Sequence, residues 1–305
     1  LVCIYTGAGT SFTQCLAYSN DRGRTFTTYA GNPVLPHIVG SNRDPRVFWH
    51  GPSNQWVMAL YLADHDFALF GSPQLKQWTK LCDVRVEGSS ECPEFFPLAL
   101  DGSAAKPTWV FYGGNGMYLL GDFDGQAFTP QSGPYRLHHG NCFYASQTYN
   151  DAPDGRRVCV GWGTSETPGM PFNQMMTFPV ELTLRTTPAG PRLFANPVAE
   201  IRALYKTTHH LSDLALPLSD NPLAAVRGDL LDAQAEFALH GAAQVGFYVR
   251  GIPVVYETNH QRLVCLGCTM PLECPEGKLT LRVLADRTSL EIFANDGAGY
   301  MPVAV

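Results

Sequence analysis

The sequence lacks several features that mark common classes of protein. No apolar run approaches the roughly 18 residues that a membrane-spanning helix needs, and no charged segment followed by an apolar one marks a signal peptide. The 21 basic residues are outnumbered by 27 acidic ones and form no cluster that could neutralise phosphates. We therefore expect neither a membrane nor a nucleic acid as a partner.

The two ends of the sequence lack the signs of a natural start and stop. Leu1 is not a methionine and stands within a strand-like run, LVCIYTG, and the last residues, MPVAV, show no evident closing strand. The sequence thus reads as a fragment, cut at the N-terminus and also at the C-terminus. On this interpretation the lack of a signal peptide has no bearing on secretion.

Stretches rich in alanine, leucine, glutamate and lysine are also few, which disfavours long helices. The sequence instead contains 29 glycines, 23 prolines and 11% aromatic residues, a composition typical of short strands joined by tight turns. With 305 residues, 45% of them hydrophobic, it can bury a substantial core. We predict an all-β protein.

The nine cysteines are an odd number and stand mostly in apolar runs, so we expect most of them to be buried thiols. Cys265, Cys268 and Cys274, with His260, are the best candidates for a metal site. They lack the paired spacing of a zinc site, and we predict that the protein has no metal.

Strand-like runs recur about every 50 residues over the first 200 residues. A polar pair followed by an apolar strand begins three successive units: RDPRVFW at Arg43, ECPEFFPL at Glu91 and NCFYASQTY at Asn141. Tryptophans mark the middle strands of the same units, at Trp56, Trp109 and Trp162. Four-stranded units of this length indicate a β-propeller, in which one strand of each blade lines a central channel. Residues 1–198 supply about four such blades.

The period is lost near residue 200. Residues 199–210 read as a linker with a short helix, and residues 211–305 contain alternating strands typical of a β-sandwich. The pair Asp286 and Arg287 is expected at the turn between the last two strands.

Two carboxylates at the starts of successive units suggest glycosidic bond cleavage. A retaining glycosidase needs a protonated carboxylic acid and a second carboxylate about 5 to 5.5 Å away. If Asp44 and Glu91 both face the channel, each raises the pKa of the other, and Arg43 favours the charged form of Asp44. Glu91 would then carry a proton near neutral pH. The alternative is that Arg43 and Asp44 form only a local structural ion pair.

RDPRVFW and ECPEFFPL, with AYSNDRGRTFTTYAGNPVL before them and NCFYASQTYNDAPDGRRVCVGWG and PGMPFNQMMTFPVELTLR after, resemble glycoside hydrolase family 32. These enzymes are β-fructofuranosidases: invertases, inulinases and levanases. DRTSLEIFANDG near the end is similar to the C-terminal sandwich of the family. The resemblance implies a five-bladed propeller, incomplete here, followed by a β-sandwich. It also implies release of fructose from levan, inulin or sucrose by a retaining route without a cofactor.

The resemblance also implies roles for single residues. Glu91 would be the acid/base, and Asp44 the transition-state stabiliser, holding hydroxyls of the bound fructose with Arg43. Three further residues would line the substrate-binding site: Cys92, Tyr144 and Trp162. A fructose-containing oligo- or polysaccharide is the implied partner. The location stays unknown, with a secreted or periplasmic one favoured by the family, and PFNQMMTFP favours levanase-like relatives.

The sequence departs from the family in two places. The nucleophile of the family is the aspartate of a WMNDPNG-type motif, which has no match here, so this fragment alone is expected to be inactive. Cys142 stands before Phe-Tyr-Ala where the family commonly has aspartate, which puts a polar contact there in doubt.

Two other functions compete with hydrolysis. A cleft that keeps Arg43 and Asp44 but lacks a nucleophile suits a non-catalytic carbohydrate-binding protein or an inactive truncated homologue. SNDRGRTF resembles the Asp-box turn of sialidases, but the arginines do not recur at unit spacing as a sialidase would need. We expect this segment to be a structural turn.

Overall fold

The computed structural model describes residues 1–103, 106–215 and 221–305. Within these residues the strands form six sheets, none closed on itself, and the helical segments are short 3-10 turns. No helix of this part of the chain is long and apolar enough to cross a membrane. The prediction of an all-β protein is confirmed.

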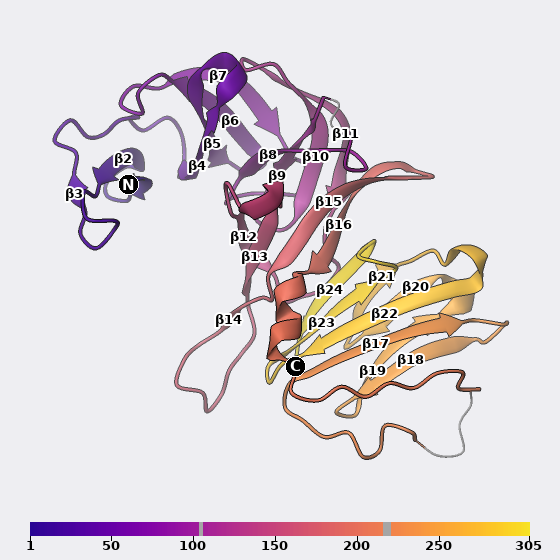
Figure 1. Ribbon diagram of the computed structural model, residues 1–305. Coiled ribbons are helices and arrows are strands. Elements are labelled where there is room, and N and C mark those ends of the chain that lie inside the picture. The colour runs from indigo at the N-terminus through magenta and orange to yellow at the C-terminus, as the bar shows by residue number, and fades with distance from the viewer. Residues whose placement is uncertain (104–105, 216–220) are drawn as a thin grey trace.

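Four of the six sheets lie in residues 1–197 and follow one another along the chain. Figure 1 shows them along an arc, with β4, β8 and β12 towards its inside. The strands of the four sheets, in order, are β1 (Val2–Gly7), β2 (Thr13–Tyr18) and β3 (Thr27–Thr28); β4 (Arg43–His50), β5 (Gln55–Ala63), β6 (Asp66–Ser72) and β7 (Thr79–Arg85); β8 (Glu94–Leu98), β9 (Thr108–Tyr112), β10 (Met117–Phe123) and β11 (Phe128–Arg136); and β12 (Tyr144–Thr148), β13 (Val158–Gly163), β14 (Met175–Met176), β15 (Val180–Thr187) and β16 (Gly190–Pro197).

The sequence of β5, QWVMALYLA, shows why these sheets stack. Its central residues are all apolar, and alternate side chains point to opposite faces of the sheet. Val57 and Ala59 pack into the cluster shared with the following sheet, whereas Met58 and Leu60 pack into a cluster that contains Ile4 of the first sheet. A strand covered on both faces needs apolar residues at every position, and this continuous run supplies them.

The turn SNDRGRTF is held by its own side chains. Asp21 accepts hydrogen bonds from the backbone N–H of Thr25 at 2.9 Å and from the Thr25 hydroxyl at 2.7 Å. Ser19 Oγ accepts the Gly23 N–H at 2.7 Å. The bonds from Thr25 lower the pKa of Asp21 to about 2. The interpretation of this segment as a structural turn is confirmed.

The third tryptophan of the repeat does not occupy the same position in its strand as the first two. Trp56 and Trp109 are the second residues of β5 and β9, whereas Trp162 lies near the end of β13. Trp109 is 5% exposed and Trp162 is 41% exposed. Trp162 therefore lies at the opposite end of its strand from the other two, and it is not a core residue.

The strands from Leu231 to Ala304 form two sheets that share one apolar core. One sheet has the order β17-β22-β23-β24 and the other β18-β19-β20-β21. Asp286 and Arg287 lie in the turn between β22 and β23, as predicted. The expectation that no closing strand follows was wrong, because β24 contains most of MPVAV and pairs with β23. The strands are β17 (Leu231–Ala238), β18 (Gln244–Val249), β19 (Ile252–Glu257), β20 (Arg262–Cys265), β21 (Cys268–Pro271), β22 (Lys278–Ala285), β23 (Ser289–Ala294) and β24 (Gly299–Ala304).

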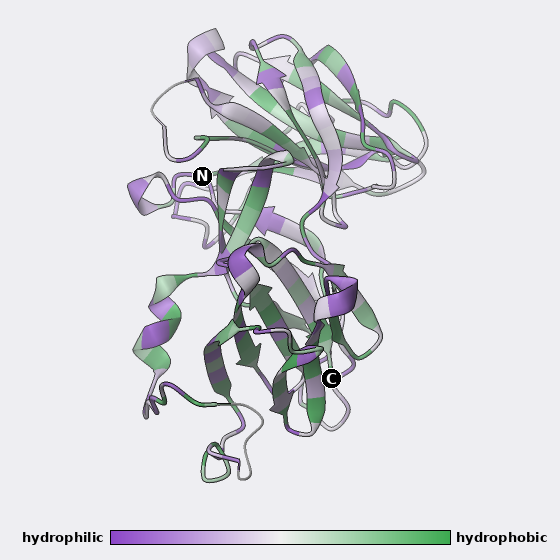
Figure 2. Ribbon diagram, turned by 90° about the vertical axis from the view of Figure 1, so that its right-hand side faces the viewer, coloured by the Kyte–Doolittle hydropathy of each residue, from purple (hydrophilic) through white to green (hydrophobic). Residues whose placement is uncertain are grey.

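Short 3-10 helices lie between strands of both parts. They are η1 (Gly51–Ser53), η2 (Pro153–Gly155), η3 (Ala199–Leu204), η4 (Thr258–His260) and η5 (Pro275–Gly277). η3 lies where a short connecting helix was expected. Figure 2 shows hydrophobic residues concentrated on the strands, with hydrophilic residues frequent in the connections.

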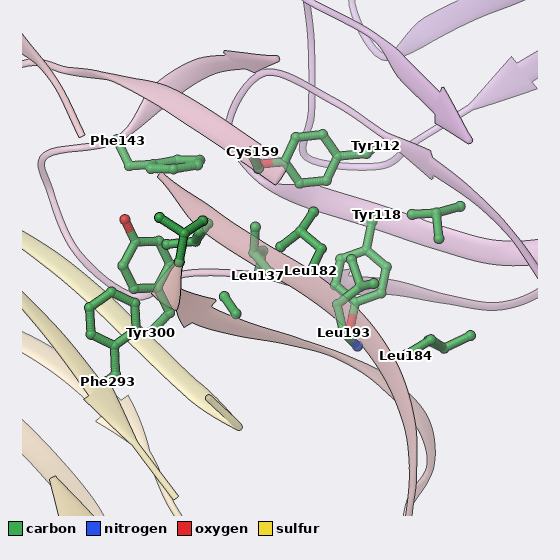
Figure 3. Close-up of a cluster of buried hydrophobic side chains, with 14 of the residues drawn as sticks. Tyr112, Tyr118, Leu137, Phe143, Cys159, Leu182, Leu184, Leu193, Phe293 and Tyr300 are labelled. Carbon is green, nitrogen blue, oxygen red and sulfur yellow. Dashed lines mark hydrogen bonds between the residues drawn. The ribbon is translucent and has the colours of Figure 1, made fainter. Parts of the chain in front are cut away.

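The two parts of the chain are packed against each other through aromatic rings. Tyr300 of β24 stacks on Phe293 at 4.8 Å between ring centroids and meets Phe143 edge-on at 5.7 Å (Figure 3). These three residues belong to one buried cluster with residues of β8–β16. The backbone N–H of His139 also donates to the Tyr300 carbonyl at 2.9 Å. The sandwich is thus part of the same core as the fourth sheet.

The cysteines are less buried than expected. All nine are free thiols; three are buried, five are half-buried and Cys3 is exposed. No group of three or more possible metal ligands is found in the described ranges.

Gly140 lies where the two parts meet without room for a side chain. A Cβ atom at this position would lie 1.7 Å from the Pro302 carbonyl oxygen. We expect Gly140→Ala to lower the free energy of unfolding by about 1–3 kcal/mol, as overpacking does, because the backbones of the two parts must move apart. Gly51→Ala is the matched control, since no heavy atom lies within 4 Å of its Cβ position. Equal stabilities of the two variants in urea unfolding would contradict this account of the interface.

Candidate active site

The predicted site residues meet where the inner strands of three sheets begin. Arg43 is the first residue of β4, Glu91 lies just before β8, and Tyr144 is the first residue of β12. An Arg43 Nη2–Glu91 Oε1 ion pair joins the first two, and the Tyr144 hydroxyl donates to Glu91 Oε2. Arg43 and Tyr144, which are far apart in the sequence, thus both bind the carboxylate of Glu91.

The backbone at these positions is unusual. The pairing of β4 with β5 shifts between Arg43 and Arg46, which marks a bulge at Asp44. Asp44, Glu91 and Cys92 have φ values of 62°, 60° and 43°. Residues other than glycine seldom adopt positive φ, and such strain clusters at active sites and ligand-binding positions. The bulge turns the side chains of Arg43 and Asp44 towards the Glu91 segment.

Asp44 is held by contacts from β1 and from the segment just before β8. Its Oδ2 accepts the backbone N–H of Cys92 at 3.0 Å, and the Cys92 thiol lies 3.6 Å from the same oxygen. Its own N–H donates to Thr6 Oγ1 of β1 at 3.1 Å. Burial raises the pKa of Cys92 to about 12, so this thiol stays protonated. Cys92, predicted to line the substrate-binding site, contacts Asp44 in the structure.

The predicted protonation of Glu91 is wrong for this arrangement. The hydrogen bond from Tyr144, followed by that from Arg43, lowers the pKa of Glu91 below its usual value. The Nε of Arg43 lies 3.9 Å from Asp44 Oδ2, whereas its Nη2 directly contacts Glu91. Without a bound ligand, Glu91 is therefore ionised at neutral pH.

Trp162 and Tyr144 form an aromatic wall beside Glu91. They are paired across β12 and β13, with ring centroids 6.3 Å apart. The indole N–H of Trp162 donates to Gln174 Oε1 at 2.5 Å. An exposed ring of this kind can pack against the apolar face of a sugar while nearby polar groups bind its hydroxyls.

A second set of charges, which the sequence reasoning missed, lies deeper between the same strands. Arg46 Nε contacts Glu94 Oε1 at 2.9 Å, and Glu94 is fully buried. Thr148 of β12 donates its hydroxyl to Glu94 Oε2 at 2.5 Å and accepts Arg46 Nη2 at its carbonyl at 2.6 Å. The motifs carried a signal for this pair, since RDPR and ECPE place arginine and glutamate at the same two positions. The two arginine–glutamate pairs link β4 to β8 and to the residues just before β8.

Cys142 is buried where the fourth sheet meets the sandwich. Its side chain is fully buried, and its backbone N–H donates to the Pro302 carbonyl of the sandwich at 3.2 Å. Burial, followed by the charge of Glu291, raises the pKa of Cys142 to about 11. The doubt about a polar contact at this position therefore concerns the interface between the two parts.

The fold and the site together define a propeller-and-sandwich protein with a carboxylate cluster built around an arginine. Comparison with known families agrees: the profile "Glycosyl hydrolases family 32 N-terminal domain" matches residues 1–197, and "Glycosyl hydrolases family 32 C terminal" matches residues 200–301. The chain belongs to glycosyl hydrolase family 32. The alternative of a sialidase is thereby excluded.

Individual relatives are similar over much of this chain. A levanase of Bacillus subtilis (strain 168) is 34% identical over 348 residues, covering 97% of this chain and 51% of the levanase. An invertase of Schizosaccharomyces pombe (strain 972 / ATCC 24843) is 31% identical over 236 residues, covering 70% of this chain and 39% of the invertase. The chain thus spans about half the length, or less, of these relatives.

Solved structures confirm the fold. An exo-inulinase from Aspergillus awamori has a TM-score of 0.85 at 23% identity, covering 100% of this chain and 74% of that one. A fructan 1-exohydrolase IIa from Cichorium intybus, in complex with 1-kestose, has a TM-score of 0.81 at 18% identity, with 100% and 75% covered.

Removal of the Tyr144 hydroxyl should raise the pKa of Glu91. The hydrogen bond from Tyr144 is the largest cause of the lowered pKa, and Tyr144→Phe removes it. A lowered folded-state pKa means stability that is present above the unfolded value of 4.5 and is lost as the pH falls through the folded pKa, so the variant should lose less stability on acidification. A carboxyl ¹³C NMR titration measures the pKa directly.

Tyr149→Phe is the control for this titration, because Tyr149 is an exposed tyrosine on the same chain segment. The pKa of Glu91 should stay at its wild-type value in this variant. If Tyr144→Phe also left it there, the Tyr144 hydroxyl would not be bound to Glu91 in solution.

Proposed function

We propose that this chain is the main part of a retaining glycoside hydrolase that releases fructose from levan, inulin or sucrose. The observation that carries the proposal is the convergence of Glu91, Asp44 and Arg43 at the inner end of neighbouring sheets, beside an exposed aromatic wall. Glu91 is the acid/base. Asp44 stabilises the transition state and, with Arg43, binds hydroxyls of the fructosyl unit, while Cys92, Tyr144 and Trp162 line the same site.

Glu91 must gain a proton before it can act as an acid. Its present bonds to Tyr144 and Arg43 favour the ionised form. A fructosyl unit that takes over Arg43 and displaces water would remove one of these bonds and increase desolvation, and both changes raise the pKa of a carboxyl. We infer that substrate binding itself prepares the acid.

A retaining mechanism needs a nucleophilic carboxylate about 5 to 5.5 Å from the acid. Asp44 is occupied by the Cys92 N–H, and its proposed role is to bind hydroxyls. We propose that the nucleophile is not among these 305 residues, and that residues 1–198 are about four blades of a five-bladed propeller. Residues 199–210 would then link it to a sandwich at 211–305.

The second candidate is a carbohydrate-binding protein that does not cleave its ligand, or an inactive truncated homologue. One observation favours it: Glu91 is ion-paired and ionised, as suits a residue that binds hydroxyls. In this case the Arg43, Asp44 and Glu91 cluster would hold fructose without turnover.

Fructose release separates the two candidates. It should be measured on levan, inulin and sucrose, for the 305-residue chain and for the full product of its gene. We expect the full product to release fructose, with levan the best substrate, and the 305-residue chain to bind fructo-oligosaccharides without release. Glu91→Gln in the full product should lower kcat by about 10²–10⁴, the usual effect of losing a general acid.

Glu87→Gln is the matched control, because Glu87 is an exposed glutamate whose carboxylate is ion-paired with the exposed Arg85. Its activity should equal that of the parent. Binding of fructo-oligosaccharides without any release by the full gene product would reject the hydrolase in favour of the binding protein.

A further inference from the structure

A buried group of hydrogen bonds joins the sandwich to the segment behind Trp162. Glu291 of β23 is fully buried. Its Oε1 accepts the backbone N–H of Phe178 at 2.7 Å, and its Oε2 accepts the Tyr300 hydroxyl at 2.6 Å. Thr177, the neighbour of Phe178 in the chain, has its side chain near the Tyr300 hydroxyl. We call Glu291, Tyr300, Thr177 and Phe178 the Glu291 group.

This group holds the backbone on which Trp162 is carried. Thr177 Oγ1 accepts the N–H of Gly161 at 2.9 Å, and the Thr177 N–H donates to the Gly161 carbonyl at 2.9 Å. The next residue, Trp162, is paired with Met176 of β14. The segment from Met176 to Phe178 is therefore bound to the sandwich on one side and to the Trp162 strand on the other.

The same strand leads directly to the proposed acid. Trp162 is paired with Tyr144, and Tyr144 donates its hydroxyl to Glu91. A shift of the segment behind Trp162 would move the aromatic wall and change the position of the Tyr144 hydroxyl. Packed, hydrogen-bonded elements of this kind transmit a displacement that isolated side chains would absorb.

We propose that Glu291 of the sandwich is a positioning residue for the active site: through the Glu291 group it sets the place of Trp162, and hence how a fructosyl substrate is bound. The fructosyl substrate in this inference rests on the proposed function. The positioning of Trp162 by Glu291 does not.

A purely stabilising role does not explain a carboxylate here. Burial raises the pKa of Glu291 to about 7, and the titratable groups that face it, Tyr300, Asp286 and Cys142, include no cation. A raised folded-state pKa means stability that is complete below the unfolded value of 4.5 and is lost as the pH rises through about 7. At neutral pH the buried carboxylate thus lowers the stability of the fold. What it contributes is the pair of hydrogen bonds that its two oxygens accept.

The test compares three variants of the full gene product. Glu291→Leu removes both acceptor oxygens. Glu291→Gln keeps an amide oxygen that can accept the Phe178 N–H and an amide NH₂ that can donate to the Tyr300 hydroxyl oxygen. Ser289→Ala is the matched control. Ser289 is fully buried on the same face of β23, and its hydroxyl has no hydrogen-bond partner in the described part of the chain. The indole N–H signal of Trp162, assigned with Trp162→Phe, reports its position by ¹H–¹⁵N NMR, and KM and kcat on 1-kestose report its effect.

We expect Glu291→Leu to shift or broaden the Trp162 signal and to raise KM roughly tenfold, with a smaller change in kcat, because misplaced contacts to the substrate weaken binding. Glu291→Gln should restore both readouts to near the parent values, and Ser289→Ala should leave them unchanged. If Glu291→Leu fails to fold, Thr177→Val cuts the next link, at Gly161, and should shift the same signal.

The inference is overturned if a folded Glu291→Leu or Thr177→Val variant leaves the Trp162 signal in place. It is also overturned if the signal moves but KM and kcat stay at the parent values. Failure of the proposed function would look different: the parent itself would not cleave 1-kestose, while the NMR comparison would still show whether Glu291 positions Trp162.

Discussion

The architecture of the site depends on the pairing of opposite charges between two neighbouring inner strands. Arg43 and Arg46 enter β4 from the same motif, and each meets a glutamate of the next unit, Glu91 or Glu94. The deeper pair is buried, where an unpaired charge would be strongly destabilising, so it holds β4 and β8 of two different sheets against each other. The outer pair is half-exposed and can exchange its partners for those of a ligand. The same arginine–glutamate pairing thus occurs once as a buried structural pair and once as a half-exposed pair that is available to a ligand.

The sandwich takes part in this arrangement although it contributes no residue to the carboxylate cluster. Its last strand shares an aromatic core with the fourth sheet, through Phe143 and Tyr300. Its buried carboxylate, Glu291, contacts the segment that carries β14. The strand β14 of the fourth sheet has only two residues, and the residues that follow it are hydrogen-bonded to the sandwich. By the proposal above, a change at Glu291 would act on the site through this segment without a contact to the ligand.

Much of the fold and part of the site could be predicted from the sequence. The repeat of about 50 residues depends on local strand and turn patterns, and it correctly placed the starts of β4, β8 and β12 near one another. It failed where the position within a strand mattered. Trp162 fits the spacing of Trp56 and Trp109, but lies at the other end of its strand, because spacing along the chain does not count the residues that loops and bulges take up.

The sequence by itself determined the class of fold, the family and the charged residues Arg43, Asp44 and Glu91, because motif order and strand patterning are properties of the chain. Only the tertiary structure decided which charges pair. Arg43 lies next to Asp44 in the sequence but contacts Glu91, since the bulge and the positive φ at Asp44 turn the side chains, and both exist only when neighbouring sheets hold the backbone in place. The burial of Cys142 and the contacts of Glu291 likewise follow from packing between segments more than 100 residues apart, which no local pattern records.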